Sequence, residues 1–191
     1  DGSLRRFGSD GHEIGHPWKR LPFAADSHVV LSAGGRYVGA GGDDALILRG
    51  TDGRALWRAD DRFLTGFSPD GRLVGLLAGD GTLEIRASAT GRMVRRVRID
   101  PTYVTYDLSH PDAHLASTGE EAQLYDPKTF RPLGDPFPSI DTPRLLGTGD
   151  RLATNTAQGV QIWDLDPDHW VRAACAMAGR NLTKAEQRAY L

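Results

Sequence analysis

The chain has 191 residues, 23 basic and 25 acidic side chains and a hydrophobic share of 39%, which are the proportions of a globular domain with its own core. A net charge of −2 excludes bulk attraction to nucleic acid or to an anionic lipid surface, and no apolar run approaches the roughly 18 residues of a membrane-spanning helix. The single cysteine, Cys175, cannot form a disulfide within the chain, so we expect a reducing, cytoplasmic location.

Only three of the basic residues are lysines and 23 residues are glycine, a bias that indicates a GC-rich bacterial genome and a chain with many turns. The chain begins at Asp1, without a start methionine or a signal peptide, so we expect it to be part of a longer protein. Short alternating apolar runs recur about every 40 residues, and this internal repeat determines the predicted fold.

Residues 1–22 are predicted to hold two short strands, Ser3–Phe7 and Glu13–Trp18, with a turn at Asp10-Gly11 between them. Apolar residues that alternate with period two are typical of strands rather than helices. Because a complete unit of the repeat has four strands, this pair is predicted to be the third and fourth strands of a preceding unit.

Three complete units are predicted over residues 23–59, 60–99 and 100–138. In the second unit, the turn Phe67-Ser-Pro-Asp-Gly-Arg72 leads into a strand at Leu73–Leu77, since Pro presets φ and Asp and Gly supply the turn conformation. Each third strand repeats an apolar residue at the same place, which aligns Leu4, Leu46, Leu83, Ala122 and Val160. Fourth strands follow a glycine turn, as in Ala55–Trp57 and Met93–Arg98.

The last unit, residues 139–166, is predicted to contain only three strands, at Arg144–Gly147, Arg151–Thr156 and Val160–Asp164. A helical pattern takes the place of the fourth strand. Pro167 suits the first turn of a helix, and the apolar residues that follow share one helical face: Trp170, Ala174, Met177 and Ala178.

We expect this helical face to dock against the strands, because a lone short helix with an exposed apolar face is marginal in water. Gly179 is predicted to end the helix, and Thr183-Lys-Ala-Glu186 is a capping box that begins a second one. The tail 167–191 is therefore predicted to be a helical extension.

Three segments, Phe67–Arg72, Asp80–Arg86 and Gly159–Asp164, resemble the repeat of bacterial WD40 proteins. The resemblance covers residues 1–166, although only the last unit has the namesake Trp163-Asp164 pair. It implies an all-β fold, a partial WD40-type β-propeller of about four blades and two strands of a preceding blade, with a short C-terminal helical tail. The blades are expected at 23–59, 60–99, 100–138 and 139–166.

The tail from Trp170 to Thr183 resembles the ending of actinobacterial multidomain WD40 proteins, in which the propeller follows an effector such as a STAND-type NTPase, a kinase or a protease. WD40-type propellers close by borrowing the outer strand of the last blade from their N-terminal end, which leaves no free sheet edge. The resemblance therefore implies that the missing strand, and further blades, come from before Asp1. The fragment alone is then expected to self-associate.

The segment His12-Glu-Ile-Gly-His16 matches the H-E-x-x-H motif of zinc proteases. That motif needs a helix, because only one helical turn brings both imidazoles to one metal. Gly15 lies inside the segment, and Pro17 disfavours a helical conformation at His16. We therefore predict an extended segment whose two histidines do not share a metal.

The other motif-like segments are interpreted as structural. Asp164–Asp168 resembles the start of a calcium loop, but His169 and Cys175 occupy the places of its Gly and Glu, so helix capping is preferred. Gly39–Gly42 and Gly147–Gly149 lack the Lys-Ser/Thr of a phosphate loop and are predicted to be turns.

Three further groups have an ordinary structural interpretation. The carboxylate pairs Asp43-Asp44 and Asp60-Asp61 are predicted turn residues, and Cys175 is predicted to be packed rather than nucleophilic. A run of basic residues on one strand divides between its two faces, so a solvated edge is preferred over a nucleic-acid site for Arg95, Arg96 and Arg98.

Rigid rims of loops suit recognition of a protein or peptide, so the predicted function is a non-catalytic interaction or sensor module of a larger bacterial signalling or regulatory protein. No catalytic, cofactor-binding or metal-binding residue is assigned, and no cofactor, nucleic acid or membrane contact is expected. The alternative is a propeller enzyme, such as a lactonase-like or metal-dependent hydrolase, with an axial site. The six histidines show no repeat-spaced pattern that would surround an axis: His12, His16, His28, His110, His114 and His169.

Overall fold

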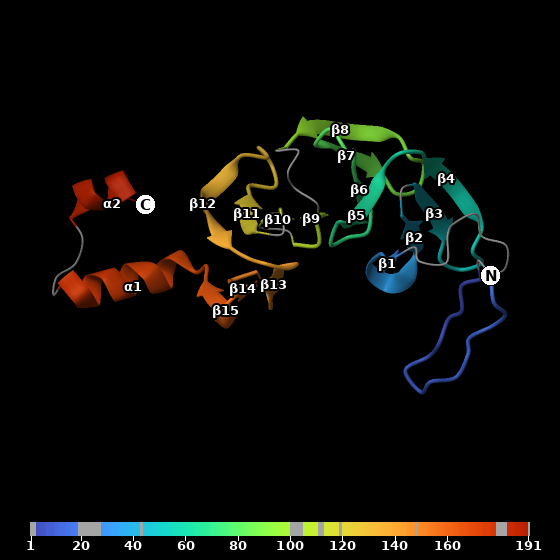
Figure 1. Ribbon diagram of the computed structural model, residues 1–191, viewed down its shortest axis with the longest axis horizontal. Coiled ribbons are helices and arrows are strands. Elements are labelled where there is room, and N and C mark those ends of the chain that lie inside the picture. The colour runs from blue at the N-terminus through green and yellow to red at the C-terminus, as the bar shows by residue number, and fades with distance from the viewer. Residues whose placement is uncertain are drawn as a thin grey trace.

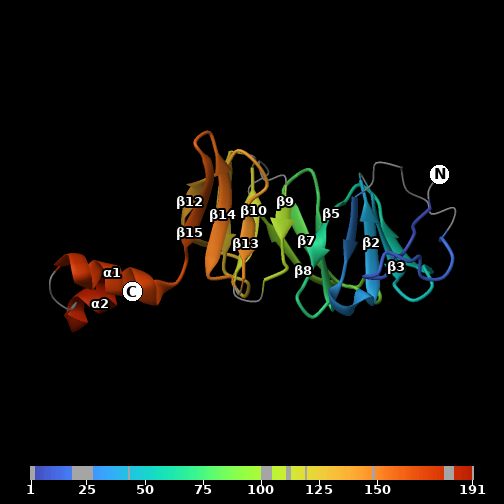
Figure 2. The same cartoon turned by 90° about the horizontal axis from the view of Figure 1, so that it is seen from below.

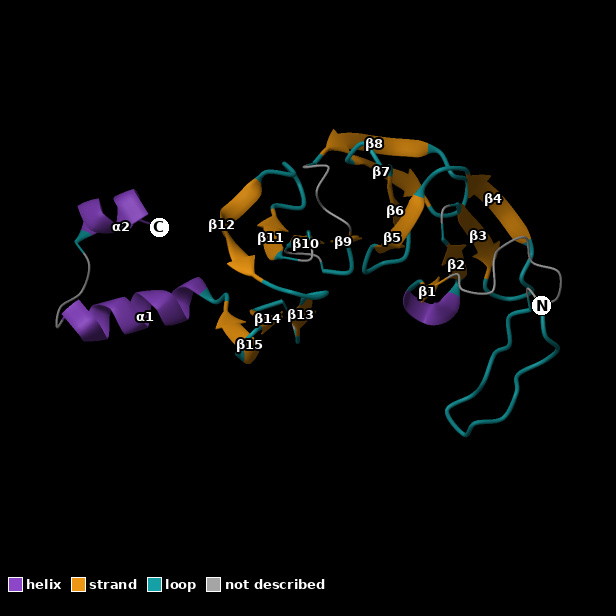
Figure 3. Cartoon of the chain, viewed as in Figure 1, coloured by secondary structure: helices purple, strands orange, loops and turns teal. Residues whose placement is uncertain are grey.

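The computed structural model describes residues 3–18, 28–42, 44–99, 105–110, 113–118, 120–147, 149–178 and 183–190. Within these ranges, strands form four antiparallel sheets that stand side by side in an arc (Figures 1 and 2). Helical segments lie at the C-terminal end of this arc (Figure 3). The all-β propeller arrangement predicted from the repeat is confirmed.

Three of the sheets have four strands each, in chain order. The first contains β1 (His28–Leu31), β2 (Tyr37–Gly41), β3 (Ala45–Arg49) and β4 (Ala55–Ala59), with a 3₁₀ turn at Ala33–Gly35 after β1. The second contains β5 (Phe63–Phe67), β6 (Leu73–Leu77), β7 (Thr82–Ala87) and β8 (Met93–Arg98). The third contains β9 (Thr105–Asp107), β10 (His114–Ser117), β11 (Glu121–Tyr125) and β12 (Pro132–Pro138).

The fourth sheet has three strands among the described residues: β13 (Arg144–Leu146), β14 (Arg151–Thr156) and β15 (Gly159–Asp164). Its outward face is apolar and open, since Val160 is 70% and Ile162 53% exposed. At the other end of the arc, residues 3–18 form a hairpin held by the bridges Leu4↔Trp18 and Phe7↔Glu13, where the sequence predicted two continuous strands.

The core lies between neighbouring sheets. One cluster between the first and second sheets includes Ile47, Leu64 and Leu76, and another between the second and third includes Ile85 and Leu108. Middle strands are therefore covered on both faces, and such strands have continuous apolar runs instead of alternation.

This two-sided burial explains an error in the predicted alignment. β2 pairs Gly39 with Ile47, and β6 pairs Gly75 with Ile85, so Ile47 and Ile85 are equivalent. Leu46 consequently aligns with Glu84 and not with Leu83. In β3 every residue from 45 to 48 is buried, so apolar periodicity could not distinguish this register from one shifted by a residue.

The tail forms α1 (Pro167–Ala178) and α2 (Lys184–Tyr190). The predicted docking of α1 is wrong: Trp170 is 50% and Met177 85% exposed, and the helix extends away from the sheets (Figure 2). Only its first turn is held, by a 2.7 Å hydrogen bond from Trp170 Nε1 to the carbonyl of Asp164. The longer of the two described helices has 12 residues, and neither is long and apolar enough to cross a membrane.

Candidate interaction surface

Successive sheets are joined at their perimeter by a recurring contact. Trp57 on β4 stacks on the turn of the second sheet at Gly91, where an added Cβ would lie 2.8 Å from the indole ring. Its Nε1 donates a 2.8 Å hydrogen bond to the carbonyl of Ser88. Trp18 of the hairpin covers Gly53 of the first sheet in the same way. Both glycines have positive φ, which a residue with a side chain adopts only with strain.

The contact changes between the second and third sheets. Arg95 occupies the position of Trp57, because it pairs with Ile85 as Trp57 pairs with Ile47. The turn position of Gly91 is taken by Phe130, which keeps the positive φ of 59°. The Arg95 guanidinium lies 4.4 Å from the Phe130 ring centroid and donates a 2.5 Å hydrogen bond to the carbonyl of Lys128.

A pocket of about 510 Å³ opens beside this contact. Its walls are mostly apolar, and Leu73, Leu108 and Phe130 contribute to them. Polar groups stand among them, including those of Asp70, Arg95 and His110. We call this site the junction pocket. Its size lies in the range of small-ligand and side-chain binding sites, which is about 300–1,000 Å³.

Because antiparallel strands alternate in direction, successive strand connections lie at opposite ends of each sheet. The turn end carries the connections from the first to the second strand and from the third to the fourth. These connections contact one another through hydrogen bonds such as that from Ser88 N to Arg72 O, 2.9 Å. The opposite end, the loop end, carries the remaining connections, linked by bonds such as Ser139 N to Glu120 O, 2.9 Å. The junction pocket lies at the turn end.

Over the first three sheets, the two ends have opposite charge, whereas the turn end of the fourth sheet includes Asp150, Asp164 and Asp166. The turn-end segments 32–36, 49–54, 68–72, 88–92 and 126–131 hold seven basic side chains, all exposed: Arg36, Arg49, Arg54, Arg72, Arg92, Lys128 and Arg131. The same segments hold three acidic ones. In the loop-end segments 41–44, 59–62, 78–82, 118–121 and 138–143, the described residues include one basic side chain, that of Arg62. They include seven acidic side chains: Asp44, Asp60, Asp61, Asp80, Glu120, Glu121 and Asp141.

The three carboxylates of these turn-end segments are engaged within their own turns. Asp70 accepts hydrogen bonds from Ser68 Oγ (2.7 Å) and Arg72 N (3.0 Å), and the backbone bond is the main reason why its pKa lies below the ordinary value. Asp126 accepts three such bonds, and Asp52 binds Arg49 and the amide of Arg54. These acids shape turns and leave the positive charge of the end in excess.

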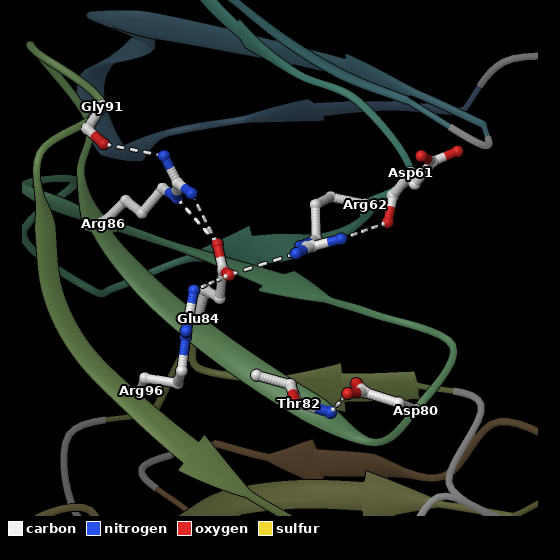
Figure 4. A network of polar contacts seen from close by, with 8 residues as sticks. All are labelled: Asp61, Arg62, Asp80, Thr82, Glu84, Arg86, Gly91 and Arg96. Atoms are coloured by element: carbon white, nitrogen blue, oxygen red, sulfur yellow. Dashed lines mark hydrogen bonds and ion pairs between the residues drawn. The ribbon is translucent and has the colours of Figure 1, made fainter.

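A buried carboxylate lies on the face of the second sheet that meets the first (Figure 4). Glu84 is fully buried and accepts hydrogen bonds from Arg86 (2.6 and 2.9 Å), Arg96 (2.9 Å) and Arg62 (3.3 Å). Burial would raise the pKa of Glu84, but the hydrogen bonds from Arg86 and Arg96 and the charges of Arg86 and Arg62 outweigh it, and the pKa lies below its ordinary value. The network links β7 to β8 and to the residue that precedes β5.

Two larger hollows also lie among the described residues. One, of about 560 Å³, lies along the inner strands and is lined by residues that include His28, Asp107 and Arg144. His28 Nε2 bonds the carbonyl of Leu64 at 2.8 Å, and its ring stacks on Phe63. The alternative of an axial enzyme site would place its chemistry here.

The other, an apolar groove of about 770 Å³, lies between β12 and the last sheet and is lined in part by Leu133, Phe137, Trp163 and Trp170. Phe137 packs on Trp163, with ring centroids 5.2 Å apart. Among the described residues this sheet has no fourth strand, and α1 begins where the other sheets make their last turn.

The structure confirms that the H-E-x-x-H segment is not helical. Glu13 pairs with Phe7 in the hairpin, and Gly15 has a φ of 72°. His12 Nδ1 lies 3.3 Å from an oxygen of Asp10. Within the described part of the chain, no group of three or more His, Cys, Asp or Glu is placed to hold a metal ion.

The capping interpretation of Asp164–Asp168 is also confirmed. Asp166 Oδ1 accepts the backbone N–H of Asp168 at 2.9 Å, and α1 begins at Pro167. His169 Nδ1 lies 2.7 Å from Asp164, which binds the first turn to the end of β15. The capping box of α2 is formed, with Thr183 N 2.8 Å from Glu186 Oε2.

The turn predicted for one glycine-rich segment is confirmed, and the turn predicted for the other is mostly wrong. Gly147 and Gly149 lie in a turn with positive φ, as predicted. The turn predicted at Gly39–Gly42 is wrong for its first three residues, which belong to β2. Gly39 is required there for packing, since a Cβ would lie 2.6 Å from Leu64.

The remaining predicted residues fall in ordinary places. Asp60 and Asp61 lie in a turn, Asp44 lies next to β3, and Asp43 is outside the described residues. Cys175 is half-buried on α1. The arginines of β8 divide between faces as predicted, with Arg95 on Phe130 and Arg96 on Glu84.

Sequence reasoning missed the junction pocket and the Glu84 network. The sequence does hold a signal for the pocket: Arg95 replaces Trp57, and Phe130 replaces Gly91, at equivalent positions of the repeat. These equivalences become visible only with the strand pairing, because the predicted alignment of the first unit was shifted by one residue.

No protein-family model and no curated protein matches the chain. Solved structures do match: U3-55K (TM-score 0.66, 16% identity, 86% of this chain and 55% of that one) and the WD40 repeats of RRP9 (0.67, 16%, 87% and 55%). BamB from Moraxella catarrhalis also matches (0.59, 17%, 86% and 52%). At these identities the likeness shows the fold, and the chain spans about half the length of each protein.

The four sheets and these neighbours together show a WD40-type β-propeller fold.

Proposed function

We propose that the chain is a non-catalytic protein-interaction or sensor module of a larger bacterial signalling or regulatory protein. The observation that supports it is the separation of charge over the first three sheets: the turn-end segments hold seven basic and three acidic side chains, and the loop-end segments hold seven acidic and one basic among the described residues. Complementary charge steers association and selects among partners. A rigid sheet frame holds such groups in place with little ordering cost on binding.

The proposal includes the domain organisation. Residues 1–166 form part of a propeller, with 1–22 as the end of a preceding blade, and residues 167–191 form a C-terminal extension. The open face at Val160 and Ile162 supports further blades, because exposed apolar sheet faces favour association. An upstream effector domain and a cytoplasmic location belong to the same proposal.

Site-specific photo-crosslinking in the full-length protein tests the interaction function. A photoreactive residue would replace Thr90 at the turn end or Gln158 at the loop end, both of which are exposed. A discrete protein adduct in the native host from either position, competed by unlabelled protein, is the expected result. Failure of both positions to give an adduct above the level of a core position such as Leu76 would contradict the proposal.

The enzyme alternative makes a different prediction for the hollow along the inner strands. A metal-dependent hydrolase would bind one tight equivalent of a divalent metal there, and substitution of His28 or Asp107 would abolish binding. Metal titration of the full-length protein with elemental analysis distinguishes the two functions.

A further inference from the structure

The junction pocket exists because a ring that fills the first two junctions, from the hairpin to the first sheet and from the first to the second sheet, is missing from the third. Trp18 and Trp57 cover Gly53 and Gly91, and the Cβ atoms of those glycines would overlap the indole rings. At the third junction the long side chain of Arg95 extends over Phe130 instead. The space beside it is the pocket of about 510 Å³.

The base of the pocket is apolar and preformed. Leu108 and Ile85 are 2% and 3% exposed, and Phe130 is 8% exposed, so these walls belong to the core between two sheets. Val94 lies at the mouth and is 47% exposed. A rigid apolar hollow of this kind accepts one aliphatic or aromatic side chain, which is the usual anchor of a binding hot spot.

The charged side chains that line the pocket are those of Arg95 and Asp70, and further basic side chains lie on neighbouring turns. Lys128 lies against Arg95 through its carbonyl. Arg72 and Arg92 are exposed on neighbouring turns. Asp70 also lines the pocket, but its Oδ1 accepts two hydrogen bonds within its own turn. The rim therefore offers guanidinium and ammonium groups to an incoming carboxylate.

Nucleic acid fits this end less well than a peptide does. Single strands bind proteins through bases stacked on exposed aromatic faces. Here Phe130 is buried and one face of its ring is covered by Arg95.

We propose that the junction pocket anchors an acidic peptide segment of a partner protein, with one apolar side chain in the pocket and Asp or Glu side chains on the basic rim. The proposal rests on the proposed interaction function and specifies its partner by charge complementarity.

The test is selection of binders from a random 12-residue peptide library on the full-length protein. Enriched peptides are expected to combine several Asp or Glu residues with one conserved large apolar residue. Lys128→Glu should weaken the selected peptides about tenfold, and Val94→Trp, which fills the mouth, should abolish binding. Arg98→Glu makes the same charge change on β8 close to the loop end and should leave affinity unchanged within about twofold.

The proposal would be overturned if the library gave no enriched peptides, or if the enriched peptides lacked acidic residues. It would also be overturned if Lys128→Glu and Arg98→Glu changed peptide affinity equally, or if the Val94→Trp variant bound the peptides as tightly as the natural protein. Displacement of the peptides by a random single-stranded oligonucleotide pool at lower concentration would assign the site to nucleic acid. Crosslinks from Gln158 but not from Thr90 would leave the interaction function standing and remove this site from it.

Discussion

A buried histidine should make the third sheet sensitive to acid. His114 is 7% exposed, and its Nδ1 lies 3.2 Å from the hydroxyl of Tyr106, which is 1% exposed. Burial lowers the pKa of His114 to about 4, although the charges of Asp107 and Asp126 act in the opposite direction. The neutral imidazole is therefore the form that the folded sheet accepts.

The sign and size of the effect follow from linkage. The unfolded chain binds the proton with a pKa near 6.5, so the unfolded state gains protons first as pH falls. Stability from His114 is complete above about pH 6.5 and declines towards pH 4, by about 3 kcal/mol in total and by about 2 kcal/mol at pH 5. A loss of 2 kcal/mol accelerates amide exchange through unfolding of this sheet about 30-fold.

Hydrogen exchange of peptides from β9–β11 at pH 5 and pH 7 measures this directly. The His114→Gln variant has no imidazole to protonate at this position. After correction for intrinsic exchange, its exchange rates at pH 5 and pH 7 should therefore differ by about 30-fold less than those of the natural protein. His16→Gln on the exposed hairpin is the matched control and should behave as the natural protein does. Identical pH dependence of the natural protein and His114→Gln would refute the argument.

Three other perturbations have defined outcomes. Glu84→Ala leaves three guanidiniums without their shared carboxylate and should lower the free energy of unfolding by about 3 kcal/mol. Urea titration measures this cost, and a value below about 1 kcal/mol would show that the arginines turn to solvent instead. Gly53→Ala combines a φ of 73° with a Cβ 2.2 Å from an indole carbon, whereas Gly34→Ala at a φ of 68° meets nothing within 4 Å. The first should therefore lower the melting temperature more than the second, which has only the backbone cost of about 1 kcal/mol, and equal shifts would contradict the stacking contact. The chain expressed alone should self-associate through its open last sheet in sedimentation velocity, and Val160→Lys with Ile162→Lys should reduce this association. A monodisperse chain with the natural residues at both positions would show that the open face needs no cover.

Much of the local structure could be predicted from spacing alone. The strands Leu73–Leu77, Met93–Arg98 and Arg151–Thr156 begin and end where the alternating runs and turn residues place them. Pro167 and the capping box Thr183–Glu186 likewise mark the helices. These features depend on backbone preferences and local hydrogen bonds, which a short segment carries with it.

Helix docking was the main local inference that failed. The apolar face of α1 is evident from Trp170 and Met177, but an amphipathic pattern does not specify what covers it. The bond from Trp170 to Asp164 fixes the first turn, and the described side chains beyond it, residues 171–177, are exposed or half-buried. Amphipathicity is a property of one element, whereas docking depends on a second surface.

The sequence by itself determined the repeat, the four-stranded unit and the turns, because each depends on residues within about 40 positions of one another. Tertiary structure decided which residues are equivalent between units, since β3 is apolar on both faces and its register is set only by its neighbours. It also decided that Glu84 would meet three arginines, and that Arg95 on one sheet would leave a pocket against Phe130 on the next. The Glu84 contacts join different strands of one sheet, and the Arg95–Phe130 contact joins two sheets, so their geometry exists only once the strands and sheets are packed.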